Sequence, residues 1–163
     1  MGMSGCFAAI DAPTLERLHA SPDKLEAFLY PDDEDGEPEQ GACIEKAWHG
    51  IHYLLAGDAD FVDTPAGWAV LGGTEFGDDK GGRRVRWLAP DDVRRVAAAL
   101  PGVQMFSDRY ALELMNRDAI YPEGVWVRDG DNARDYLVEH YETLLAFYRA
   151  AAERGDGVLL WIS

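Results

Sequence analysis

Two histidines and a glutamate lie close together in the sequence, at Glu45, His49 and His52. On an α-helix, positions three and four apart are neighbours, so these three side chains would share one edge of the helix. Imidazole titrates near neutral pH and is a common metal ligand. The spacing predicts a candidate general acid/base or metal position beside Trp48, which Tyr121 or an arginine could complete.

A structural role for the same residues is the alternative, and it is favoured. Glu45 would pair with His49 one turn later, and His52 would hydrogen-bond a backbone carbonyl at the edge of the core. The zinc-protease pattern His-Glu-x-x-His is absent, and no second cluster offers a third ligand. No metal and no cofactor is therefore predicted. The candidate ligand or pocket residues are Glu45, Trp48, His49, His52 and Tyr121.

These residues need a helix to position them, and the stretch 44–56 has the pattern of one. Its apolar residues recur at helical spacing and form one broad face. Gly50 and Tyr53 are expected to point away from the centre of that face, and Gly57 is a natural left-handed stop. The apolar face consists of Ile44, Ala47, Trp48, Ile51, Leu54 and Leu55.

The rest of the chain is expected to form short strands and helices, without the regular alternation of a doubly wound nucleotide-binding fold. Strands are expected at 4–10, 68–71, 85–88 and 158–162. Helices are expected at 11–20, from 21 onward, and at 89–100, 107–117 and 131–154. The pattern predicts an α+β fold, in which residues 1–163 form a single compact domain with about six helices packed on a small sheet of short strands. The order of the strands is not predicted.

Two charged segments interrupt this pattern. Residues 31–41 carry six carboxylates among prolines and glycines, which is typical of a solvated loop and does not fit a calcium-binding loop. Lys80, Arg83, Arg84 and Arg86 form a basic segment beside Gly81 and Gly82. It lacks the order of a phosphate-binding loop, so these side chains are expected to neutralise nearby acids.

Composition restricts the classes of function. The formal charge of −15 comes from 30 acids and 15 bases, and it disfavours binding to nucleic acids or to anionic membranes. Cys6 and Cys43 are the only cysteines. Without a signal peptide or a long apolar run, both are expected to be reduced, buried thiols in a cytoplasmic protein.

Several segments resemble one bacterial family over nearly the whole chain. They are the Met1–Met3 opening, the run Lys46–Leu55, Leu71–Gly73, Ile120–Pro122 and the Phe147–Tyr148 helix before a terminal strand. Together they are similar to the YfbM-like proteins, also called the domain of unknown function 1877. The resemblance implies a compact α+β domain of uncharacterised activity, and it supplies no catalytic residues.

The leading functional hypothesis is a non-catalytic acidic binding module for a basic protein partner, in the manner of an inhibitor or immunity protein. It follows from the charge and from the lack of a catalytic signature, so a non-enzymatic role is favoured while an enzymatic one stays open. The alternative hypothesis is a small-molecule enzyme or metal-binding site built on Glu45, His49 and His52.

Overall fold

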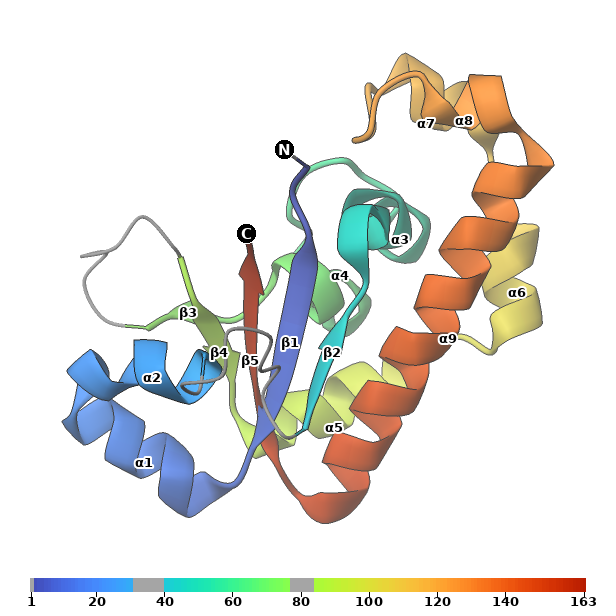
Figure 1. The fold of residues 1–163 in the computed structure, drawn as a ribbon. Coiled ribbons are helices and arrows are strands. Elements are labelled where there is room, and N and C mark those ends of the chain that lie inside the picture. Colours follow the sequence, from blue (N-terminus) through green and yellow to red (C-terminus); the bar gives the residue numbers. More distant parts are fainter. Residues whose placement is uncertain (1, 31–39, 77–83) are drawn as a thin grey trace.

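The computed structural model describes residues 2–30, 40–76 and 84–163. Its centre is a sheet in which every neighbouring pair of strands is antiparallel, in the order β2-β1-β5-β4-β3 (Figure 1). The first and last strands of the chain lie side by side, in a register that runs from Gly5 opposite Ile162 to Ile10 opposite Gly157. The strands are β1 (Gly5–Ile10), β2 (Gly41–Cys43), β3 (Thr74–Glu75), β4 (Arg86–Leu88) and β5 (Gly157–Ile162).

Helices cover both faces of this sheet, which explains why all six residues of β1 are buried. Successive side chains of a strand point to opposite faces. Phe7 and Ala9 accordingly join the larger core, whereas Cys6, Ala8 and Ile10 join a smaller core on the other face. The α+β fold predicted from the sequence is therefore confirmed.

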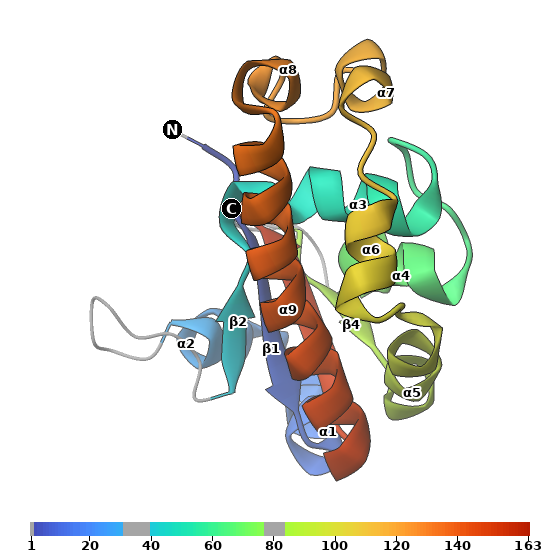
Figure 2. The ribbon, with the colours of Figure 1, turned by 90° about the vertical axis from the view of Figure 1, so that its right-hand side faces the viewer.

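The smaller core is covered by α1 (Ala12–Ala20) and α2 (Leu25–Leu29), which follows a 3-10 turn at Pro22–Lys24. The other helices build the larger core, and α7 and α8 lie at the N-terminal end of the long helix α9 (Figure 2). These helices are α3 (Trp48–Ala56), α4 (Pro65–Leu71), α5 (Pro90–Ala99), α6 (Val103–Asp108), α7 (Leu112–Arg117), α8 (Val125–Asp129) and α9 (Asp131–Arg154).

The helix predicted at 44–56 lies in the larger core, with its first turn as a 3-10 helix at Glu45–Ala47 and a left-handed stop at Gly57. It is buried on more sides than predicted, because Gly50 and Tyr53 are also buried. A Cβ atom on Gly50 would lie 2.8 Å from Leu137 and 2.9 Å from Trp126. Only glycine therefore allows α3 to approach α8 and α9 so closely.

The strand predicted at 68–71 is wrong, because this segment belongs to α4. The helix begins with a side-chain cap, in which the Gly67 amide donates to Thr64 Oγ1 at 3.2 Å, and Pro65 occupies the first helical position. These start signals lie before the apolar run, and they outweigh its strand-like composition.

The prediction of a single helix at 107–117 is also wrong. Two short helices, α6 and α7, occupy this region, and the chain leaves the helical conformation between them. The Tyr110 hydroxyl donates to the Gly130 carbonyl at 2.9 Å, which ties the break to the start of α9. Such a long-range contact leaves no periodic signal in the sequence.

The prediction of two free thiols is wrong as well. Cys6 and Cys43 are directly opposite each other in the β1–β2 ladder and form a disulfide. Strand β2 was not predicted, so nothing in the sequence pattern brought the two cysteines together. Reduced cysteines were one reason to expect a cytoplasmic location, and the disulfide removes that reason.

The two charged segments lie partly outside the described residues, which exclude 31–39, Lys80 and Arg83. Arg84 has the acidic partner that was predicted, with Nη1 3.6 Å from Glu75 Oε1. Arg86 behaves differently, because its guanidinium donates to the carbonyls of Gly72 and Val70 at the end of α4. In the described part of the chain, no helix is long and apolar enough to cross a membrane.

Candidate functional site

Three of the predicted residues form an aromatic stack at the start of α3. The Trp48 ring lies 4.8 Å from His49 and 5.7 Å from Tyr121, with interplanar angles of 14° and 26°. The Trp48 indole donates to the Met3 carbonyl at 3.1 Å, and the Met3 amide donates to the Tyr121 hydroxyl at 2.9 Å. The N-terminal segment thereby holds the edge of the stack.

Both nitrogens of His49 are bonded to the backbone. The Tyr121 amide donates to Nδ1 at 2.9 Å, so Nδ1 carries no proton. Nε2 then carries the hydrogen and donates to the Ala59 carbonyl at 3.0 Å. His49 therefore joins the turn at Tyr121–Pro122 to the loop that follows α3, and it keeps no lone pair for a metal.

His52 is fully buried one turn further along α3. Its Nε2 donates to the Asp60 carbonyl at 2.8 Å, as the structural alternative predicted. Burial lowers the pKa of His52, and the bond to Asp60 only partly opposes this effect. His52 Nδ1 is a buried acceptor that has no partner among the described residues.

The predicted pairing of Glu45 with His49 is absent among the described residues, because backbone groups occupy both nitrogens of His49. Glu45 is exposed, and its carboxylate lies beside the Tyr136 phenol on α9, whose pKa is raised first by burial and then by this charge. Nowhere in residues 2–30, 40–76 and 84–163 do three or more His, Cys, Asp or Glu side chains gather as a metal site requires. The contacts of His49 and His52 favour the structural role.

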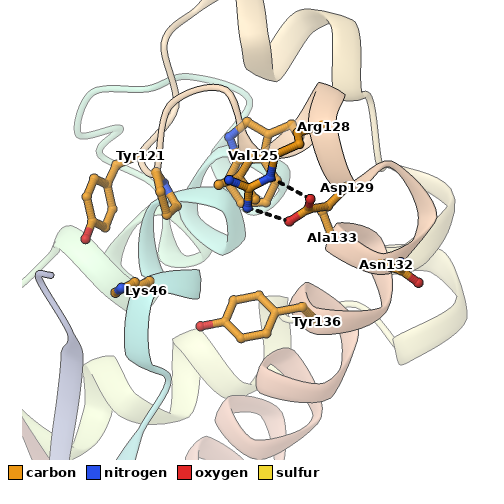
Figure 3. Close-up of a pocket in the computed structure, with 10 residues that line it drawn as sticks. Lys46, Tyr121, Val125, Arg128, Asp129, Asn132, Ala133 and Tyr136 are labelled. Carbon is orange, nitrogen blue, oxygen red and sulfur yellow. Dashed lines mark hydrogen bonds and ion pairs between the residues drawn. The ribbon is translucent and has the colours of Figure 1, made fainter.

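A pocket of about 450 Å³ opens next to this stack, between the 3-10 turn before α3, the Tyr121–Pro122 turn, α8 and the start of α9 (Figure 3). We call it the α8–α9 pocket. Tyr121 is the only predicted site residue that lines it, together with Lys46 and Tyr136. The sequence did not reveal this pocket, because its walls come from segments far apart in the chain and carry no common motif.

A second hollow, of about 220 Å³, lies between the loop after α3, α4 and β4. We call it the acidic hollow. Its lining includes three aromatic side chains and two carboxylates: Phe61, Trp68, Trp87, Asp63 and Asp92. The signal that could have indicated it is the loop itself, in which Asp58, Asp60 and Asp63 surround Phe61.

Comparison with known proteins agrees with this fold. Residues 1–161 match the family described as "Domain of unknown function (DUF1877)". The chain belongs to this family. Its fold is similar to that of a protein of unknown function, YfbM from Escherichia coli, with a TM-score of 0.70 and 21% sequence identity over 98% of this chain and 99% of that chain. No curated protein matches the chain significantly. The family resemblance seen in the sequence is confirmed, and it assigns no activity.

Proposed function

We propose that the protein is a non-catalytic binding protein that captures a basic protein partner through its acidic surface. The observation that carries this proposal is the acidic hollow. Asp63 and Asp92 contribute carboxylates, and no lysine or arginine of the described chain lines the hollow. Asp92 also forms an ion pair outside this lining, with Arg95 Nη1 3.8 Å from Asp92 Oδ1. Phe61 lines the hollow and is 52% exposed, so its ring is accessible to a partner.

These groups suit a cationic side chain. An ammonium or guanidinium group is attracted to the face of an aromatic ring and to a carboxylate, and both lie together here. The Trp68 indole donates to Asp63 Oδ1 at 2.8 Å, which fixes the carboxylate beside the ring. The hollow therefore fits the end of one lysine or arginine side chain from the partner.

The charge of the whole chain supports the same partner. Several arginines are already paired with the nearest carboxylate, such as Arg117 with Asp118 at 2.8 Å and Arg154 with Asp156 at 2.7 Å. The excess of acids leaves a net charge of −15, and its long-range field should accelerate the approach of a basic protein. An inhibitor or immunity-like role would use this attraction, and nucleic acids and anionic membranes would be repelled.

The proposal is tested with a labelled peptide of alternating arginine and glycine. Fluorescence anisotropy measures its binding to the protein. We expect Phe61→Ala and Asp92→Asn each to weaken binding by about 2- to 30-fold, the range of a cation–aromatic or charge contact. The matched controls are Met105→Ala, which removes another exposed apolar side chain, and Glu153→Gln, which removes a distant charge. Equal effects of the test and control variants, or an affinity that does not fall with added salt, would contradict it.

A further inference from the structure

The α8–α9 pocket has the properties of a site for a small molecule. A volume of about 450 Å³ lies within the range of ligand-binding cavities. Pro122, Val125, Trp126 and Ala133 supply apolar walls from the turn, α8 and α9. The Trp126 ring is 1% exposed, and its indole nitrogen donates to the Ile120 carbonyl at 2.8 Å, so this wall is rigid.

Polar groups converge at one side of the pocket. Figure 3 shows the hydroxyls of Tyr121 and Tyr136 directed toward Lys46. Both polar groups lie next to Gly2. A Cβ atom on Gly2 would be 3.1 Å from Lys46 Nζ and 3.0 Å from Tyr121 Oη. The ammonium and the phenol therefore lie on the same side of the pocket, beside Gly2, and both can donate hydrogen bonds.

The charges around the pocket leave one cation available. Arg128 is bonded twice to Asp129, at 2.7 and 2.9 Å, on the opposite side of the pocket (Figure 3). Lys46 forms no ion pair with any residue that the structure describes, although the molecule carries a large excess of acid. The Tyr121 oxygen accepts from Met3, so its own hydrogen can be directed to a ligand.

The nearby Glu45 limits how much negative charge the pocket can accept. Its carboxylate lies beside Tyr136, and the molecule as a whole is strongly acidic. A dianion such as a phosphate monoester would be repelled by both, whereas a single carboxylate can pair with Lys46 alone. The apolar walls, in turn, require a hydrophobic body attached to that carboxylate.

We propose that the α8–α9 pocket binds a small aromatic monocarboxylate. The carboxylate contacts the Lys46 ammonium and the Tyr121 hydroxyl, and the ring packs against Pro122, Val125 and Trp126. This site is separate from the acidic hollow and does not depend on the proposed protein partner. The site does not involve the acid/base or metal chemistry that was predicted for His49 and His52.

The test uses 3-phenylpropionate as the probe, with its uncharged amide as the matched ligand and phenyl phosphate as the dianion. Binding is followed by amide chemical shifts in NMR spectra of the full chain. We expect shift changes centred on residues 121–136. The acid should bind at least tenfold more tightly than the amide, which lacks the charged contact to Lys46, and more tightly than the phosphate, whose second negative charge is repelled.

Lys46→Met should reduce the affinity for the acid to that for the amide and leave the amide unaffected. Lys24→Met removes the same charge at a distant 3-10 turn and should change neither. Lys46 is exposed, so the variant should fold, which its thermal unfolding checks. Equal binding of acid and amide, no effect of Lys46→Met, or no binding of any probe would each overturn the proposal. Lys46→Met should leave the affinity for the arginine–glycine peptide unchanged, so the two proposals can fail separately.

Discussion

At the scale of single residues, the two histidines of α3 hold the backbone together. Each uses Nε2 to donate to a carbonyl of the following loop, at Ala59 and Asp60, and His49 also accepts from the Tyr121 amide. The sequence predicted the helix face on which they lie, and it also predicted that His52 would bind a carbonyl. It could not predict the partners of His49, because they lie in loops whose paths depend on the whole fold.

Stability should depend on pH through His52. Burial lowers the pKa of His52 in the folded protein below the ordinary value of 6.5 for an imidazole, so the unfolded chain binds the proton more readily. The free energy of unfolding should therefore be highest above about pH 6.5 and fall as the pH drops below that value toward the lower folded pKa. Urea unfolding of wild type and His52→Gln across this range measures the contribution.

Glutamine can still donate to the Asp60 carbonyl, but it does not titrate. His52→Gln should therefore lose much of the decline at low pH. His140→Gln is the control, because His140 is only partly buried against Tyr136 and shows no such contact. An identical pH dependence in wild type and His52→Gln would contradict this role of His52.

At the scale of elements, α4 shows how local start signals decide between helix and strand. Trp68–Leu71 reads as a buried strand by composition, yet Thr64 caps a helix over this run. The finished helix places Trp68 against Asp63 in the acidic hollow. Arg86 then donates to the carbonyls of Gly72 and Val70 at the other end of the helix, which satisfies backbone acceptors that the helix leaves without a partner.

Thr64→Ala should destabilise the protein by about 1 kcal/mol, because the Gly67 amide at the helix start loses its partner. Chemical denaturation measures this change. Thr143→Ala is the matched control, since Thr143 lies exposed within α9 and its hydroxyl contacts only a carbonyl of the preceding turn, at 3.4 Å. We expect the control to change stability by less than about 0.5 kcal/mol. Equal losses in the two variants would show that Thr64 does not act as a cap.

At the scale of the whole molecule, the central sheet joins the two ends of the chain. The pairing of β1 with β5 brings Gly5 opposite Ile162, and the disulfide then ties β1 to β2. The two cores lie on opposite faces of these strands. The stability of both layers therefore depends on contacts between segments that are distant in the sequence.

Removal of the disulfide should cost about 2–4 kcal/mol, because the cross-link restricts the unfolded chain between positions 6 and 43. Denaturation of wild type with and without a reductant should show this loss. The double variant Cys6→Ala with Cys43→Ala should have the reduced stability and should not respond to the reductant. Two titratable thiols in the folded protein under oxidising conditions would be incompatible with the cross-link.

The sequence by itself determined the α+β class, the extent of α9 at Asp131–Arg154, the buried helix around Trp48, and several helix ends. These features follow from hydrogen bonds and apolar spacing within a few residues, so the local sequence contains the information. Only the tertiary structure decided the strand order, the Cys6–Cys43 disulfide, the partners of His49 and the walls of the α8–α9 pocket. Each of these depends on contacts between residues far apart in the chain, for which one sequence offers no local pattern.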